Sequence, residues 1–267
     1  MLSSDEQTAL VARISAGPKY RTVHGATVTD VVAHAAANHG TTKAAEKWAR
    51  EVLHQIKADY LLNAKPSRVE AQLVRRAAAG ESVATRCRAA LELHRSWSER
   101  TASVDDYYQA ILDLADGADE VADVACAMGP FSVPLFTGDP FRYRGFDLNT
   151  FYVELPAKVL GAAAPPVEHV DVVAEPERVV TDVAVLMKTY HCLENRQTGL
   201  GWKVVAGIDA RCVVVSFPQT SFGGRPLRTV ERHMVELERN ARGQRWTSCR
   251  STIDDEALVA VHKGRRG

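Results

Sequence analysis

From Glu120 onward the chain alternates short apolar segments with helical stretches, and this alternation restricts the possible folds more than any other feature of the sequence. Apolar and β-branched residues predict five strands, at Val121–Ala125, Tyr143–Phe146, Glu168–Val170, Asp182–Met187 and Arg211–Phe217. Strands separated by helices pair in parallel, because each crossover helix packs back on the sheet. We therefore predict an α/β, doubly wound, Rossmann-like sheet, mostly parallel and seven-stranded. The segments Thr247–Ile253 and Ala257–His262 would complete it as a hairpin.

The first strand leads into a turn of small residues, Ala125 to Gly129, and then into a helix start. At such a position backbone N–H groups face a ligand, and small residues let that ligand approach closely. Only Gly129 is a glycine, so the three-glycine pattern of dinucleotide-binding folds is absent. A plain connection between a buried strand and a packing helix explains the same residues. This turn alone therefore does not establish a ligand site.

Polar residues at the ends of the following strands favour a ligand site. Asp147 ends the second strand, Asp171 ends the third, and Met187 ends the fourth. Because parallel strands end at one edge of the sheet, these side chains should gather where ligands of such folds bind. Asp147 is placed to accept ribose hydroxyls and Asp171 an adenine amino group, although each acid alone is explained equally well as a loop or capping residue. The pattern suits NAD or S-adenosylmethionine, and the single glycine disfavours the pyrophosphate of NAD.

Residues 1–110 have the composition of helices, since alanine is frequent and apolar residues recur every three or four positions. Thr27 or Thr29 is expected to cap one helix, and Pro66 to begin another. Basic residues lie beside tyrosine and tryptophan throughout this region. Basic groups bind phosphates and aromatic rings stack on bases, so as a set these residues predict a helical RNA-docking subdomain. Any one of these basic residues is explained equally well as part of a solvated helix surface.

The charge is unevenly distributed along a chain that is neutral overall. Residues 1–110 carry +3 (15 basic, 12 acidic), residues 111–215 carry −7 (8 and 15), and residues 216–267 carry +4 (10 and 6). Basic segments around an acidic middle suit a polyanionic substrate held outside the reaction centre, or they reflect uneven surface charge without a function.

Cysteine spacing and hydropathy argue against several other classes of protein. The five cysteines are scattered, with no CxxC pair, so neither a metal site nor a disulfide framework is expected. No apolar run is long enough to span a bilayer, and the polar N-terminus is not a secretory signal. We therefore expect a cytoplasmic monomer with no membrane partner.

Several blocks of residues occur in one order and spacing that matches a known family. The most specific blocks are Leu186-Met187-Lys188-Thr189 and Val213–Pro218, the latter followed by Ser221-Phe222-Gly223-Gly224-Arg225. Asp123-Val124-Ala125-Cys126 precedes them, and Lys19-Tyr20-Arg21-Thr22-Val23 extends the match to the N-terminal part. In these blocks the chain resembles the aminoglycoside-resistance 16S ribosomal RNA methyltransferases that act on guanine 1405 at N7.

The resemblance implies a class I methyltransferase domain over residues 111–267, behind a subdomain over residues 1–110 that docks on 16S ribosomal RNA within the 30S subunit. It implies S-adenosyl-L-methionine as the cofactor and aminoglycoside resistance as the outcome. Arg100 would pair with the methionine carboxylate, and Lys188 and Arg225 would face the target nucleotide. The positions that match the cofactor contacts of the family are Tyr60, His94, Arg95, Ser96, Arg100, Ala125, Asp147, Asp171, Val172, Met187 and Arg196.

The chain also departs from the family pattern. The usual Gly-Leu-Asn-Pro is replaced by Ala127-Met128-Gly129-Pro130, and Pro226–Val230 replaces a lysine-bearing tract. Three alternatives therefore stay open: a catalytically weak or silent ribosome-binding paralogue, a methyltransferase with another RNA target, and an NAD-dependent oxidoreductase. Guanine N7 has a free lone pair, so its attack on a sulfonium methyl needs alignment rather than a general base. That agrees with a sequence in which no catalytic acid–base pair stands out.

Overall fold

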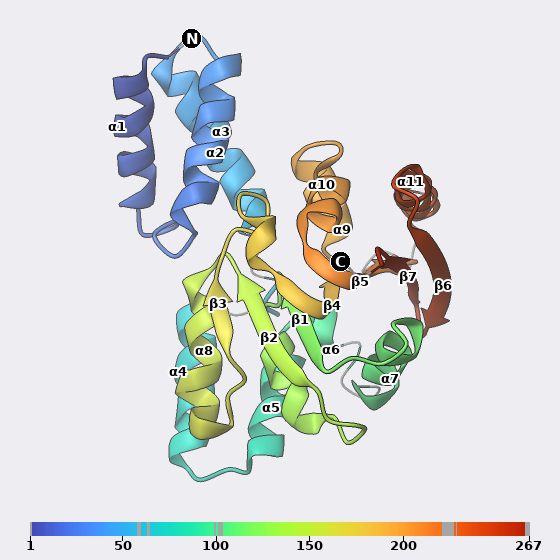
Figure 1. Ribbon diagram of the computed structural model, residues 1–267. Coiled ribbons are helices and arrows are strands. Elements are labelled where there is room, and N and C mark those ends of the chain that lie inside the picture. Colours follow the sequence, from blue (N-terminus) through green and yellow to red (C-terminus); the bar gives the residue numbers. More distant parts are fainter. Residues whose placement is uncertain are drawn as a thin grey trace.

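The computed structural model describes residues 2–57, 60–62, 65–98, 100, 104–220, 227 and 229–264. Within them, seven strands form one sheet in the order β3-β2-β1-β4-β5-β7-β6 (Figure 1). Strands β1 to β5 are parallel, and β7 runs antiparallel between β5 and β6. The predicted sheet and its closing hairpin are confirmed. The strands are β1 Glu120–Val124, β2 Arg142–Asp147, β3 Val167–His169, β4 Val180–Met187, β5 Asp209–Pro218, β6 Thr247–Ile253 and β7 Glu256–His262.

Helices cover both faces of this sheet, because alternate strand residues point to opposite sides. Val183 and Val185 of β4 share an apolar cluster with α4, α5, α7 and α8, whereas Ala184 and Leu186 pack with α9, α10 and α11. These helices are α4 Pro66–Ala78, α5 Val83–Glu92, α7 Val104–Leu114, α8 Thr150–Leu160, α9 Tyr190–Arg196, α10 Leu200–Gly207 and α11 Thr229–Gly243. The short helix α6 spans Arg95–Ser98.

Three N-terminal helices stand apart from the sheet and have a core of their own. Helices α1 Ser4–Ser15, α2 Gly25–Asn38 and α3 Thr42–Ile56 enclose a separate apolar cluster that includes Leu10 and Leu53. Figure 1 shows this α1–α3 unit beyond the carboxyl ends of the parallel strands. The helical character of the N-terminal region is confirmed. The domain boundary at residue 110 stays a prediction. Because α1–α3 enclose a cluster distinct from the two clusters that flank the sheet, we propose that these three helices alone form the separate unit.

The start of helix α2 differs from the sequence prediction. His24 is the N-cap residue, and its ring Nδ1 accepts a hydrogen bond from the backbone N–H of Ala26 at 3.3 Å. Thr29 lies inside the helix and donates to the carbonyl of Gly25 at 3.0 Å. The prediction that Thr27 or Thr29 caps this helix was therefore wrong. The expected helix start at Pro66 is confirmed.

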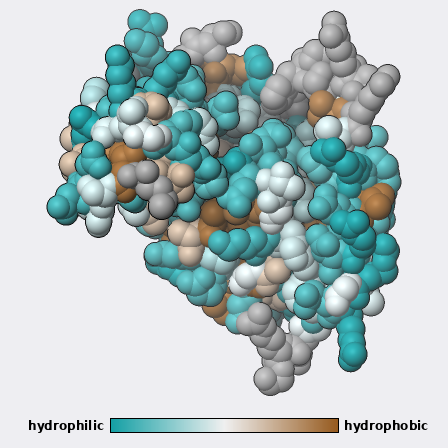
Figure 2. Space-filling view, turned by 90° about the horizontal axis from the view of Figure 1, so that it is seen from above, coloured by the Kyte–Doolittle hydropathy of each residue, from teal (hydrophilic) through white to brown (hydrophobic). Residues whose placement is uncertain are grey.

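Within the described residues, no helix combines the length and the apolar character that a bilayer crossing requires. Figure 2 shows a mainly hydrophilic face on which hydrophobic residues are scattered in separate spots.

Candidate functional site

The loop after β1 has an unusual backbone. Ala125 and Ala127 have φ values of 58° and 45°, in the left-handed region where alanine is disfavoured. A Cβ added to Gly129 would lie 2.1 Å from Oδ2 of Asp123, so no other residue fits there while Asp123 keeps its position. The displaced glycine of Ala127-Met128-Gly129-Pro130 is therefore explained by close packing on the strand-end carboxylate.

Asp123 itself is buried at the end of β1. Its Oδ2 accepts a hydrogen bond from the Tyr143 hydroxyl at 2.8 Å. Burial raises the pKa of Asp123 to about 7, and the charge of Asp147 acts in the same direction, while the Tyr143 hydrogen bond and Arg100 oppose them. Asp123 was quoted in the family resemblance but was not predicted as a site residue.

Asp147 ends β2 as predicted, and its carboxylate connects two loops. Oδ2 accepts from the backbone N–H of Ala127 at 3.0 Å, and Oδ1 accepts from that of Asn149 at 2.8 Å. The loops that would surround a cofactor are thus held together by the side chain expected to bind it.

Asp171 follows β3 and is buried, with 1% of its surface exposed. Oδ1 accepts from the backbone N–H of Val173 at 2.9 Å, and Oδ2 accepts from the hydroxyl of Thr27 at 2.6 Å. Nη1 of Arg196 lies 3.8 Å from the same Oδ2. The structure therefore brings Asp171 and Arg196 together, and it adds Thr27, which sequence reasoning missed. Val172, the next predicted contact, is buried in the apolar cluster beside α9–α11.

The predicted cations Arg100 and Lys188 meet at one carboxylate. Arg100 donates from Nε and Nη2 to the two oxygens of Glu256 at 2.7 and 2.6 Å, and Nζ of Lys188 lies 3.0 Å from Oε1. The Tyr107 hydroxyl also donates to Glu256. Burial raises the pKa of Glu256, but the positive charges of Arg100 and Lys188 have the larger effect and lower this pKa to about 2. These groups form a buried, charge-paired cluster.

Glu256 is a site residue that the sequence did not reveal. The two predicted hairpin segments end at Ile253 and begin at Ala257, which leaves Glu256 in the turn between them, where an acid carries no signal of its own. The structure places it in β7, opposite Pro218 at the end of β5. The fork of Arg100 that was expected to hold the methionine carboxylate holds this carboxylate of the chain, so the methionine role of Arg100 stays a prediction.

Lys188 also has a special backbone. Its φ is 54°, and its backbone N–H donates to the hydroxyl of Ser216 at 2.9 Å. A residue held in a disfavoured conformation by its surroundings is typical of a functional position. Met187, directly before it, lies partly buried beside the cluster of α4, α5, α7 and α8.

Tyr60, His94, Arg95 and Ser96 also lie together. The backbone N–H of Arg95 donates to the carbonyl of Tyr60 at 2.9 Å, and Oγ of Ser96 lies 3.1 Å from Nδ1 of His94. The rings of Tyr60 and His94 meet edge to face at 6.3 Å. Burial lowers the pKa of His94 to about 4, and Arg100 and Lys188 add to the effect. At neutral pH this imidazole is therefore uncharged.

These residues fit a small, partly polar cofactor. Within the described residues, Nε2 of His94 is buried and has no hydrogen-bond partner, which is costly unless a ligand supplies one. Tyr60 keeps 41% of its surface exposed despite its aromatic ring. An exposed ring next to an unsatisfied buried nitrogen suits a ligand with both apolar and hydrogen-bonding parts, as S-adenosylmethionine has.

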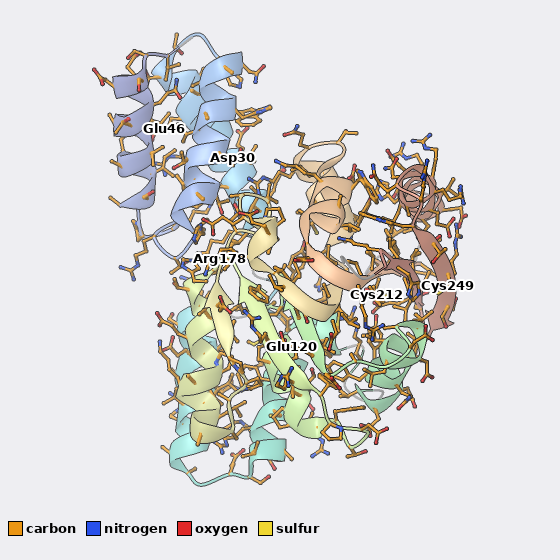
Figure 3. The ribbon with its side chains drawn as sticks, in the orientation of Figure 1. Asp30, Glu46, Glu120, Arg178, Cys212 and Cys249 are labelled. Carbon is orange, nitrogen blue, oxygen red and sulfur yellow. The ribbon has the colours of Figure 1, made fainter. Side chains whose placement is uncertain are left out.

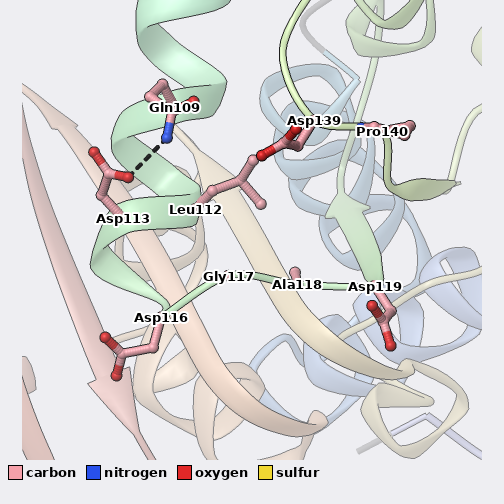
Figure 4. A pocket seen from close by; sticks show the side chains of 9 residues that line it. All are labelled: Gln109, Leu112, Asp113, Asp116, Gly117, Ala118, Asp119, Asp139 and Pro140. Atoms are coloured by element: carbon pink, nitrogen blue, oxygen red, sulfur yellow. Dashed lines mark hydrogen bonds between the residues drawn. The ribbon is translucent and has the colours of Figure 1, made fainter.

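A separate cavity of about 570 Å³ lies at the opposite edge of the sheet (Figure 4). It is lined by Asp113, Asp116, Asp119 and Asp139, which precede β1 and β2. Ligands of parallel sheets bind at the carboxyl ends of the strands, so we do not assign this cavity to the cofactor. Among the residues that the structure describes, no group of histidine, cysteine, aspartate or glutamate is arranged to hold a metal ion. Arg225, predicted to face the target nucleotide, lies outside the described residues.

Comparisons with known proteins agree with this geometry. The family model described as "Ribosomal RNA methyltransferase (FmrO)" matches residues 16–261. A 16S rRNA (guanine(1405)-N(7))-methyltransferase of Micromonospora rosea is 27% identical over 269 residues, with 97% of each chain covered. One of the same name from Proteus mirabilis is 27% identical over 251 residues, covering 88% of this chain and 89% of the relative.

Among solved structures, the crystal structure of the 16S rRNA methyltransferase RmtF in complex with S-adenosyl-L-homocysteine is similar to this one. Its TM-score is 0.78 at 25% identity, with 98% of this chain and 99% of that chain covered. The segment that the family model matches, residues 16–261, begins directly after α1 and ends in β7, so it includes every strand end described above. The chain therefore belongs to the FmrO family of ribosomal RNA methyltransferases.

Proposed function

We propose that this chain transfers the methyl group of S-adenosylmethionine to N7 of guanine 1405 in 16S ribosomal RNA. The observation that carries the proposal is the place of Asp147, Asp171 and Lys188 at the carboxyl ends of β2, β3 and β4 in a family fold. The relatives named above are guanine(1405)-N(7)-methyltransferases, and RmtF was crystallised with the demethylated cofactor. When bound, S-adenosylmethionine supplies an electrophilic methyl group on a sulfonium.

The residues of this chain would bind and orient the two partners. Asp147 would accept the ribose hydroxyls, and Asp171 with Val172 would contact the adenine. Tyr60 and Met187 would pack on apolar parts of the cofactor, while Lys188 and Arg225 would hold the target nucleotide. His94 has a pKa of about 4 and is neutral at pH 7, and guanine N7 has no proton to lose. Alignment is then the main catalytic contribution, worth up to about 7–11 kcal/mol in well-oriented reactions.

We further propose that the substrate is the assembled 30S subunit, that the chain acts as a monomer, and that methylation protects the ribosome from aminoglycosides. The α1–α3 unit would dock on the RNA with the basic residues of its helices. Exposing a base from a helical RNA segment costs a few kcal/mol, and phosphate contacts of this unit would offset that cost.

The test is to incubate the full chain with 30S subunits and labelled S-adenosylmethionine, and to map the modified base by primer extension after cleavage at 7-methylguanine. One methyl group at N7 of guanine 1405 is the expected result. A methyl at another nucleotide would show a different target. Binding of S-adenosylhomocysteine and of 30S subunits without any transfer would show the silent paralogue.

A substitution tests the proposed cofactor site. Asp147→Ala removes the ribose acceptors, so we expect affinity for S-adenosylhomocysteine to fall at least tenfold in calorimetry, the equivalent of about 1.4 kcal/mol. Asp182→Ala is a matched control, because that carboxylate also accepts two backbone hydrogen bonds, from Asp119 and Glu120, but at the other edge of the sheet. Equal affinities of the two variants would contradict the assignment of Asp147.

A further inference from the structure

The α1–α3 unit meets the rest of the molecule at residues that border the proposed cofactor site. The backbone N–H of His24 donates to the carbonyl of Leu148 at 2.7 Å, and the N–H of Thr150 donates to the carbonyl of Thr22 at 2.9 Å. Leu148 follows Asp147 directly in the chain. A movement of the helical unit would therefore act on the loop that carries the proposed ribose acceptor.

A second contact reaches the proposed adenine acceptor itself. The hydroxyl of Thr27, in the first turn of α2, donates to Oδ2 of Asp171 at 2.6 Å. Both residues are buried, with exposed fractions of 0% and 1%. Hydrogen bonds to a carboxylate are short and strong, and burial strengthens them further. With the Val173 N–H on Oδ1, the Thr27 hydroxyl fixes the orientation in which Asp171 presents its oxygens.

A third contact runs beside the second. Nη2 of Arg196, at the end of α9, lies 2.5 Å from Oδ2 of Asp30 on α2, and Nη1 of the same guanidinium lies 3.8 Å from Asp171. Asp30 is exposed and is labelled on α2 in Figure 3. One arginine thus connects the surface of the helical unit to the buried carboxylate, so α2 touches Asp171 both directly and through Arg196.

From these contacts we infer that Thr27 is a positioning residue through which RNA docking and cofactor binding are coupled. The inference rests on the proposed function, because it takes the α1–α3 unit as the part that meets RNA and Asp171 as a cofactor contact. RNA that holds the unit in the position where Thr27 contacts Asp171 also fixes the orientation of Asp171, so the affinity for the cofactor rises. Coupling between two binding equilibria is reciprocal, so the cofactor tightens RNA binding by the same factor.

Such coupling gives the enzyme a physical means of ordering its substrates. Free in solution, the chain would hold the cofactor with the lower of two affinities. Seated on its RNA, it would hold the cofactor more tightly, where the methyl group is used. After transfer, loss of either product would weaken binding of the other.

The experiment measures the dissociation constant of S-adenosylhomocysteine for the full chain, alone and with saturating 30S subunits. S-adenosylhomocysteine is used because it binds without reacting. For the wild-type chain we expect about a fivefold or larger decrease of the constant on the subunits, the lower end of typical coupling factors. For Thr27→Val, which fills the same space without a donor, we expect a much smaller decrease, because only the Arg196 contact and the backbone contacts then connect the unit to the cofactor site. Thr27→Ser restores the hydroxyl and should restore the decrease.

Thr29→Val is the matched control, since Thr29 lies on the same helix, is exposed and donates only to the carbonyl of Gly25 among the contacts of the described residues. It should keep the wild-type decrease. Asp30→Asn is a second variant at an exposed position that should fold in any case, and it should reduce the decrease by weakening the Arg196 contact.

The outcomes separate this inference from the proposed function. A wild-type chain that binds neither S-adenosylhomocysteine nor 30S subunits would refute the function. A wild-type chain that binds both, with one dissociation constant in the presence and absence of subunits, would refute the coupling alone. A folded Thr27→Val chain that loses affinity equally in both measurements would show that Thr27 is merely structural.

Discussion

At the scale of single residues, the site is organised by Glu256, whose one negative charge lies between two cations. Arg100 and Lys188 are predicted to act on different molecules, one on the cofactor and one on the RNA, yet both contact this carboxylate. Without it, two positive groups would remain buried near each other and near the neutral His94. Glu256 therefore holds both cations in place.

The variant Glu256→Gln should lower both stability and methyl transfer. Removing one partner of a buried ion pair costs about 3–5 kcal/mol, because it leaves an uncompensated charge. Urea unfolding measures this loss, and kcat/KM for 30S subunits measures the transfer. Glu231→Gln is the control, since Glu231 is an exposed partner of Arg250 whose loss should cost under about 1 kcal/mol. Equal stability of the two variants would show that Arg100 and Lys188 do not need the charge of Glu256 for the chain to stay folded.

Asp123 should make the stability of the chain depend on pH. Its pKa of about 7 in the folded state is above the value of 3.8 expected in the unfolded chain. Between these values the folded state holds a proton that the unfolded state has lost, so this group destabilises the fold as pH rises from about 4 to 7. Asp123→Asn should gain stability relative to wild type from pH 5 to pH 8, measured as the difference between urea midpoints. Parallel curves would contradict the raised pKa.

At the scale of elements, the loop from Ala125 to Gly129 is shaped by two carboxylates that it contacts. It has a left-handed backbone at two alanines where it approaches Asp147, and it has no side chain at Gly129 where it packs against Asp123. The loop therefore depends on the size of each residue in it rather than on the presence of a glycine-rich pattern.

The variant Ala127→Gly should stabilise the chain. The φ of 45° at position 127 causes a steric penalty for alanine that glycine does not have. We therefore expect the free energy of unfolding, measured with urea, to rise by about 0.5–1 kcal/mol. The backbone N–H that Asp147 accepts would be retained. The control is Ala33→Gly, at an exposed position inside α2, which should lose about 1 kcal/mol. A loss in both variants would show that the left-handed turn does not strain Ala127.

The same scale shows how much of the molecule could be predicted from sequence. The strands and the closing hairpin follow from local patterns of apolar residues, and Asp147 and Asp171 follow from their places at strand ends, whereas Lys188 was predicted from the family resemblance. Thr27 and Glu256 could not be found in this way. Their partners lie 144 and 156 positions away in the chain, and a threonine inside a helix or a glutamate beside a turn has an ordinary local explanation.

At the scale of the whole molecule, the aspartate-lined cavity and the α1–α3 unit lie at opposite ends of the parallel strands (Figure 1). The α1–α3 unit stands beyond the carboxyl edge of the sheet, and the cavity with four aspartates lies at the amino edge (Figures 1 and 4). Under the proposed docking role of the α1–α3 unit, a polyanion would be repelled by these aspartates and attracted to the basic groups of the unit. The fold would thus present its strand ends to RNA even before specific contacts form.

The double variant Lys43→Gln/Lys47→Gln tests this orientation. Both lysines are exposed on α3, one turn apart. Affinity for 30S subunits should fall, and the slope of its logarithm against the logarithm of salt concentration should decrease by about one to two. Affinity for S-adenosylhomocysteine without subunits should stay unchanged. Arg142→Gln, at the amino edge, is the control. An unchanged slope in the double variant would exclude these lysines from the RNA contact.

The position of β7 has a consequence for the newly made protein. Translation delivers the α1–α3 unit first, and helical units can fold while the remainder of a chain is still being made. The strand that carries Glu256 is the last described strand along the chain, and it lies between β5 and β6. Under the proposed docking role of the α1–α3 unit, a nascent chain would thus acquire its means of holding RNA before Arg100 and Lys188 receive their shared counter-ion. Incomplete copies would be able to attach to a ribosome but not to modify it.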